Sequence, residues 1–147
     1  MLKQLLDRGY YSVHEGFENW EDALRASVKP LIDSNAVKAA YAESIINSVK
    51  KFGPYIVIAP NIAIPHAEDY ENVNDTQICF MKSNKAVSFS DDPEQDAQLF
   101  FVLASNDEEK HLKNLKNLMK LLCDEELVER LASITTKEEF EELARSY

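Results

Sequence analysis

The segment Leu99–Ala104, with the sequence LFFVLA, constrains the fold of this chain more than any other, because all of its residues are apolar. A strand with one face in water alternates apolar and polar residues, whereas an uninterrupted apolar run is typical of a strand covered on both faces. We therefore predict that this segment is a central strand of a sheet with other layers of structure packed on either side.

Further strands and helices are predicted before and after this segment. Short β-branched and aromatic runs bounded by turn-forming residues predict strands at Tyr55–Ala59, Ala63–Ile64, Thr76–Lys82 and Ala86–Phe89. Apolar residues at helical spacing predict helices at Trp20–Ile32, from Asn35 to Lys51, from Ser105 to Leu122, at Asp124–Leu131 and at Lys137–Ala144. The predicted fold class is α/β, a mixed β-sheet with helices packed on both faces, in a single domain spanning residues 1–147.

Local signals give the expected helix ends. Gly53-Pro54 should stop the second helix, Ser105 should open the next one through a capping box with Glu108, and Thr135 or Thr136 should open the last. The leucine-rich helix should present one apolar face, formed by Leu112, Leu115, Leu118, Met119 and Leu122.

Charge and cysteine usage limit the class of protein. With 26 acidic and 16 basic residues the formal net charge is −10, which argues against a nucleic-acid partner, because phosphate backbones are bound by clustered cations. Cys79 and Cys123 lack a Cys-x-x-Cys spacing and are interpreted as reduced core residues. No run of about 18 apolar residues and no signal peptide is present, so we expect a soluble, cytoplasmic protein without direct membrane insertion.

The segment Phe52–Asp69, FGPYIVIAPNIAIPHAED, carries the principal candidate for chemistry, His66. Pro65 fixes the backbone directly before this imidazole, at the end of an apolar run. The ring could be a nucleophile, a general base or a metal ligand. Glu68, Asp69 and Cys79 form a poor metal set, and no substrate pocket is marked for a base. Acceptance of a phosphoryl group needs only an exposed nitrogen and donors for the phosphate oxygens, and is therefore the economical interpretation.

Each histidine also has a purely structural interpretation. His66 could be a partly buried residue that ends a strand, and His111 could be a solvated residue in the first turn of the leucine-rich helix. If the two rings meet, a protonated His111 could donate to a phosphoryl oxygen. His14 lies in a polar segment with no apolar strand before it, and we predict that it is a surface residue.

The chain resembles a known family on these same residues. The segment IAIPH that ends at His66, the strand Leu99–Ala104 and the pair His111-Leu112 are similar to the type-2 enzyme IIA domain of the bacterial phosphoenolpyruvate-dependent sugar phosphotransferase system, the mannitol/fructose class. Within that class, FGPYIVIAPNIAIPHAED most resembles the L-ascorbate branch. The resemblance covers nearly the whole chain.

The resemblance implies a function. The phosphocarrier HPr would phosphorylate His66, His111 would support the phosphoryl group, and a cysteine of a separate IIB component would receive it, for uptake of a sugar or sugar acid through a IIC membrane permease. Ascorbate or a similar compound is the expected substrate, and no cofactor or metal is required. The alternatives are a regulatory IIA-like protein that senses phosphorylation state in nitrogen or potassium control, and a small metal-dependent hydrolase using His66, His111 and Glu68.

This sequence departs from the family pattern at two places. Lys50 and Lys51 stand where many members have an Arg-Glu pair, and Ala67 and Glu68 follow the histidine where many have Gly-Arg. Lys50 could replace an arginine near the phosphate as a point charge, without the bidentate fork. We also predict a shallow docking face for partners, rimmed by Ile62, Ile64, Phe89 and the loop Tyr70–Val73.

Overall fold

A computed structural model describes all residues from 1 to 147. It contains six α-helices and five β-strands, with two short 3₁₀ turns at Tyr70–Asn72 and Pro93–Gln95. The elements in chain order are α1 (Leu2–Arg8), β1 (Tyr11–His14), α2 (Trp20–Asp33), α3 (Ala40–Phe52), β2 (Val57–Ala59), β3 (Asn61–Ala63), β4 (Gln77–Val87), β5 (Ala97–Ala104), α4 (Glu108–Leu122), α5 (Glu125–Ser133) and α6 (Lys137–Arg145).

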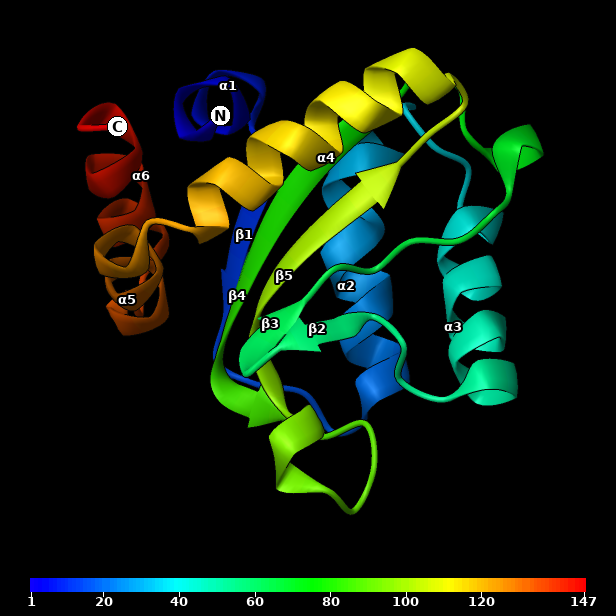
Figure 1. Cartoon of the computed structure of the whole chain (residues 1–147), viewed down its shortest axis with the longest axis horizontal. Coiled ribbons are helices and arrows are strands. Elements are labelled where there is room, and N and C mark those ends of the chain that lie inside the picture. The colour runs from blue at the N-terminus through cyan, green and yellow to red at the C-terminus, as the bar shows by residue number, and fades with distance from the viewer.

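The strands form one mixed sheet in the order β1-β4-β5-β3-β2. β1 is parallel to β4 and β3 is parallel to β5, whereas the β4–β5 and β2–β3 pairs are antiparallel. The sheet therefore has its longest, best-paired strands at the centre and short strands at both edges (Figure 1). The predicted central position of Leu99–Ala104 is confirmed, because these residues belong to β5.

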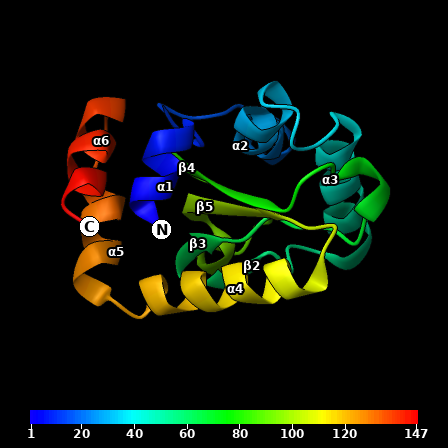
Figure 2. The ribbon, with the colours of Figure 1, turned by 90° about the horizontal axis from the view of Figure 1, so that it is seen from above.

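Alternate side chains of β4 and β5 enter two different hydrophobic cores. Cys79 and Met81 pack with α2 and α3, whereas Ile78 and Phe80 pack with the other helices. Figure 2 shows α2 and α3 on one side of the sheet and α4 on the other, with α5 and α6 grouped near α1. The predicted fold class, a mixed sheet with helices on both faces, is confirmed.

Several predicted strand bounds are wrong. Thr76–Lys82 and Ala86–Phe89 are not two strands, since β4 runs without a break through the polar residues between them. The Lys85 N–H donates to the Glu15 carbonyl, which satisfies backbone groups in that polar stretch. Tyr55–Ala59 is not a strand over its whole length either, because only Val57–Ala59 forms β2, which lies at the sheet edge with Ile58 exposed.

The sequence interpretation missed α1 and β1. Both are short, and the helix ends at Gly9, whose φ of 70° places it in the left-handed region where glycine carries no steric cost. Leu2 and Leu5 supply the buried face of α1. These elements matter for His14, which is the last residue of β1 and half-buried, not a surface residue in a polar loop.

The helix starts and the cysteines bring further corrections. Asp107, not Ser105, is the N-cap of α4, and its carboxylate accepts hydrogen bonds from the N–H groups of Glu109 and Lys110. The alternative cap Thr136 of α6 is confirmed. Cys79 is buried as predicted, but Cys123 is exposed at the end of α4.

The leucine-rich face of α4 is narrower than predicted. Leu118 is buried against the sheet, whereas Leu112 and Met119 are exposed, because they lie on the side of the helix that no other element covers. No helix of the protein is both long enough and apolar enough to cross a bilayer.

Candidate functional site

His66 lies just beyond the end of β3, in a segment held against β5. Ile64 is buried, and the N–H of Leu103 in β5 donates to the Pro65 carbonyl at 3.0 Å. Pro65 itself fixes φ directly before the histidine. These constraints bring His66 to the carboxyl end of the central strand as a half-buried residue with one side open.

The orientation of the His66 ring is set by its own backbone. Nδ1 lies 2.7 Å from the Ile64 carbonyl oxygen. Because a carbonyl oxygen can only accept, Nδ1 carries the proton in this contact and the neutral ring has its lone pair on Nε2. The geometry thus fixes one tautomer and leaves Nε2 as the nucleophilic atom.

Tyr55 holds the same histidine from a second direction. Its ring meets the His66 ring edge-on, with 5.1 Å between centroids and an interplanar angle of 87°. Its hydroxyl donates a hydrogen bond to the His66 carbonyl. Burial raises the pKa of Tyr55, although a hydrogen bond with Ser48 lowers it in part, so the phenol remains a neutral donor at physiological pH.

Tyr41, from the first turn of α3, ties the residue after the histidine to β5. Its hydroxyl donates to the Leu103 carbonyl at 2.7 Å and accepts from the Ala67 N–H at 3.2 Å. Burial raises the pKa of Tyr41 far above its ordinary value, so it stays protonated. The backbone on both sides of His66 is therefore attached to the same central strand.

His66 and His111 line one groove of about 490 Å³. His111 comes from the first turn of α4 and is half-buried, on the side of the helix that faces β5. The groove is lined by Tyr41, His66, Ala67, Glu68, Tyr70, Leu103, Ser105, Glu108, His111 and Leu112. The structure thus brings together the two histidines predicted from the sequence.

A second cavity, of about 560 Å³, opens on another side of His66. It is lined by Ser48, Phe52, Tyr55, His66, Ala67 and Glu68. Lys50 lies on the exposed side of α3 and lines neither cavity, and no other lysine or arginine lines them. The predicted point charge at Lys50 is therefore not in the wall of either cavity.

Carboxylates surround the histidines instead of cations. Glu68 lines both cavities, and Glu108 lines the groove. Partial burial raises the pKa of Asp69, but hydrogen bonds from the Ser44 hydroxyl and the Asn72 amide lower it more, and the net direction is down. Asp69 is thus an ionised anchor of the loop that follows His66.

Two other sequence interpretations can be compared with this geometry. No three His, Cys, Asp or Glu side chains gather in a way that could hold a metal ion, so the proposed hydrolase set of His66, His111 and Glu68 is not assembled as a metal site. His14 lies away from these cavities, with its ring 5.2 Å from that of Phe17, and burial lowers its pKa.

The predicted docking face is wrong in most of its members. Ile62, in β3, and Ile64, just after it, are buried in one core, and Phe89, just after β4, is buried in the other. Three other large apolar side chains line the cavities around the histidines and are exposed: Phe52 is 69% exposed, Leu112 65% and Tyr70 56%. Of these three residues, only Tyr70 belonged to the docking face predicted from the sequence.

Tyr41 and Tyr55 were also missed as site residues. Each binds a backbone carbonyl, Tyr41 that of a residue 62 positions away, and no local pattern marks such a partner. Pro54 next to Tyr55 was a turn signal, which indicated a change of chain direction but not the ring contact with His66.

Comparison with known proteins adds a finding on the whole chain. The family described as "Phosphoenolpyruvate-dependent sugar phosphotransferase system, EIIA 2" matches residues 4–146. The ascorbate-specific PTS system EIIA component of Escherichia coli (strain K12) is 30% identical over 123 residues, which are 83% of this chain and 80% of that protein.

Solved structures agree with this match. A PTS IIA domain from Streptococcus pyogenes M1 GAS superposes with a TM-score of 0.83 at 33% identity, covering 99% of this chain and 95% of that one. The enzyme IIAMTL of Escherichia coli, solved in complex with phosphorylated enzyme IIBMTL, shares the fold with a TM-score of 0.76 at 24% identity, covering 94% and 95%.

Proposed function

The chain belongs to the EIIA type-2 family of the phosphoenolpyruvate-dependent sugar phosphotransferase system, and we propose that it carries a phosphoryl group on Nε2 of His66. The donor is the phosphohistidine of HPr, and the acceptor is a cysteine of a separate IIB component. The observation that carries this proposal is the 2.7 Å contact of Nδ1 with the Ile64 carbonyl, because it leaves Nε2 of the neutral ring unprotonated on a histidine that lines both cavities.

Each transfer is an exchange of one bond to phosphorus. The Nε2 lone pair attacks the phosphoryl group, the P–N bond of the donor breaks, and the donor imidazole leaves with its electron pair. The proton on Nδ1 stays, and its hydrogen bond to Ile64 strengthens as the ring gains positive charge. A cysteine thiolate then attacks phosphorus, and His66 returns to its neutral form.

His111, when protonated, supplies a positive charge that the other residues of the cavity walls lack. The groove has two glutamates and no lysine or arginine, so a phosphoryl group there meets an unfavourable field. A protonated His111 would donate to a phosphoryl oxygen and offset part of this charge. Lys50, exposed on α3, would act only from a distance, as a screened point charge.

The exposed side chains of Phe52, Tyr70 and Leu112 form the docking surface for both partners. They flank His66 and His111 in the two cavities, and aromatic and apolar residues around a polar centre are the usual composition of an interface core. The relative enzyme IIAMTL assembles with a phosphorylated IIB protein, which supports a IIB partner here.

The transported substrate is L-ascorbate or a similar sugar acid. This assignment is supported by the ascorbate-specific relative, which is 30% identical to the chain. The chain itself would act in the cytoplasm and serve a IIC permease through the IIB component, and no nucleic acid takes part.

The test is transfer of labelled phosphate from phosphoenolpyruvate through enzyme I and HPr. Wild-type protein and His14→Ala should both be labelled, whereas His66→Ala should lose at least about 10³-fold in rate, because the accepting atom is gone. His111→Ala should slow labelling by about 10- to 100-fold. Labelled wild-type protein should then pass phosphate to the IIB cysteine. Labelling of His66→Ala at the wild-type rate would overturn the site, and failure of the onward step would favour a regulatory protein.

A further inference from the structure

A basic pocket lies on the side of α4 away from the His66 groove. It has a volume of about 220 Å³ and is enclosed by the C-terminal part of α1, the beginning of β4 and one side of α4. Figure 2 shows α1 and α4 on either side of the beginning of β4. The lining residues are Gln4, Leu5, Arg8, Tyr10, Thr76, Gln77, Ile78, Lys110, Lys113, Asn114 and Asn117.

The charge of this pocket is opposite to that of the molecule. The protein has a net charge of −10, yet three cations, Arg8, Lys110 and Lys113, line the pocket and no carboxylate does. None of these three takes part in a salt bridge, because the four salt bridges of the protein involve Arg25, Lys29 and Arg130. Three cations without a salt bridge at one small cavity favour an anion there.

Hydrogen bonds orient the Arg8 side chain in the pocket wall. Arg8 Nη1 donates to the Gln77 side-chain oxygen at 2.6 Å, and the Gln77 amide nitrogen donates to Asp75 at 2.6 Å. The guanidinium is therefore held at the wall while its remaining N–H groups stay available. The amides of Gln4, Asn114 and Asn117 add neutral donors around the same space.

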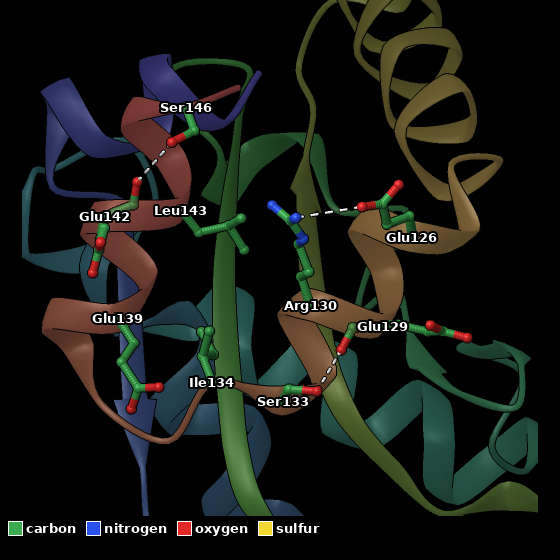
Figure 3. Close-up of a pocket in the computed structure, with 9 residues that line it drawn as sticks. All are labelled: Glu126, Glu129, Arg130, Ser133, Ile134, Glu139, Glu142, Leu143 and Ser146. Carbon is green, nitrogen blue, oxygen red and sulfur yellow. Dashed lines mark hydrogen bonds and ion pairs between the residues drawn. The ribbon is translucent and has the colours of Figure 1, made fainter.

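The cavity between α5 and α6 shows that this arrangement is not a general property of the surface. It is lined by Glu126, Glu129, Glu139 and Glu142, with the single cation Arg130 paired to Glu126 at 3.3 Å (Figure 3). That cavity would repel an anion. The basic pocket combines three cations that form no salt bridge with a lining free of carboxylates, whereas the two cavities at His66 and the cavity between α5 and α6 are each lined by glutamates.

We propose that the basic pocket binds the phosphate group of a small phosphorylated metabolite or free inorganic phosphate. Arg8 offers the fork that matches phosphate oxygens, and Lys110 and Lys113 offer point charges. The pocket is smaller than the usual range of drug-sized sites, about 300–1,000 Å³, which suits a compact anion. Beside it lies a groove of about 390 Å³ that shares Gln4, Ile78, Asn114 and Asn117 and leaves room for the rest of an ester.

The experiment is an NMR titration of backbone amides in the His66→Ala protein. This variant cannot be phosphorylated at position 66, so the measured shifts report binding at the basic pocket independently of the proposed phosphotransfer. The probes are 3-phosphoglycerate, inorganic phosphate and glycerate at constant ionic strength, because exposed cations are screened by salt. Both phosphate-containing probes should shift the amides near Arg8, Gln77 and Lys113, and glycerate should not. Tighter binding of 3-phosphoglycerate would identify an ester as ligand, and equal binding would identify free phosphate.

Variants make the result specific. Arg8→Gln and Lys113→Gln should each weaken binding by about fivefold to tenfold, and Lys116→Gln, an exposed lysine on α4 outside the pocket, should leave it unchanged. Shifts that are absent, that spread over lysines elsewhere, that appear equally with glycerate, or that ignore the Arg8 and Lys113 changes would overturn the proposal. None of these outcomes depends on phosphotransfer at His66.

Discussion

The groove at His66 and the cavity between α5 and α6 have similar volumes, about 490 and 540 Å³, but very different contents. In the groove, an imidazole is fixed by the Ile64 carbonyl and by the ring of Tyr55. In the cavity, the Ser133 hydroxyl donates to the Glu129 carbonyl, the Ser146 hydroxyl donates to the Glu142 carbonyl, and Arg130 pairs with Glu126 (Figure 3).

This difference shows that a cavity becomes a candidate site through an oriented reactive atom and not through its size. The polar groups between α5 and α6 are engaged locally or solvated, and none of them is a nucleophile held in one tautomer. Substitutions near His66 should therefore act mainly on phosphotransfer rates, whereas substitutions around α5 and α6 should act on stability.

Lys82→Met should lower the free energy of unfolding by about 2–3 kcal/mol without changing the phosphotransfer rate of the folded protein. Lys82 belongs to β4, is 1% exposed, and its ammonium donates to the carbonyls of Ala132 and Ile134 at the end of α5. Methionine keeps much of the packing but removes the donor from two carbonyl groups and from the negative end of the helix. Urea unfolding and the labelling rate measure the two quantities.

Lys85→Met is the matched control for this prediction. Lys85 lies on the same strand, but it is exposed, so its loss should change stability by less than about 0.5 kcal/mol. If Lys82→Met proved as stable as Lys85→Met, the ammonium would not be what joins α5 to the sheet. If Lys82→Met slowed phosphotransfer instead, the separation between the two regions would fail.

Tyr41→Phe should change both the free energy of unfolding and the phosphotransfer rate, because Tyr41 contributes to stability and also holds the segment of His66. Its loss removes the partner of the buried Leu103 carbonyl and of the Ala67 N–H, at an expected cost of about 1–2 kcal/mol. Looser attachment of the residue after His66 should also slow labelling about threefold to tenfold. Tyr70→Phe, at an exposed tyrosine of the same groove, should leave the free energy of unfolding unchanged. A Tyr41→Phe protein with wild-type stability would contradict the hydrogen-bond assignment.

The sequence was sufficient for the layers of the fold because they follow from periodicity. An apolar run without alternation placed β5 at the centre, and helical spacing identified α2, α3 and the helices after β5. Periodicity could not identify α1 or β1, which have only seven and four residues. It also could not show that β4 continues through polar residues, since their backbone partners lie elsewhere in the chain.

Only those residues of the candidate site that carry a local sequence signal could be predicted. His66 follows Pro65 at the end of an apolar run, and His111 lies in the first turn of a predicted helix, so both could be named as candidates from the sequence. The tyrosines that hold the His66 segment were not, because their partners are backbone carbonyls brought close by the fold. The apolar rim was misplaced because the sequence shows that Ile62 and Ile64 are close to His66 along the chain, but not that the fold buries both side chains in a core.

The smallest expected effect is a pH dependence of stability that comes from His14. Burial lowers the pKa of His14 in the folded protein, so folding favours its neutral form. The corresponding stabilisation is present above the unfolded pKa of about 6.5 and is lost as pH falls through the lower folded value. Because the ring is only half-buried, the loss between pH 7.5 and 5.5 should stay below about 1 kcal/mol. Urea unfolding of wild type and His14→Gln at both pH values measures it: the stability difference between them should shrink or change sign at pH 5.5, and a pH-independent difference would remove His14 as the cause.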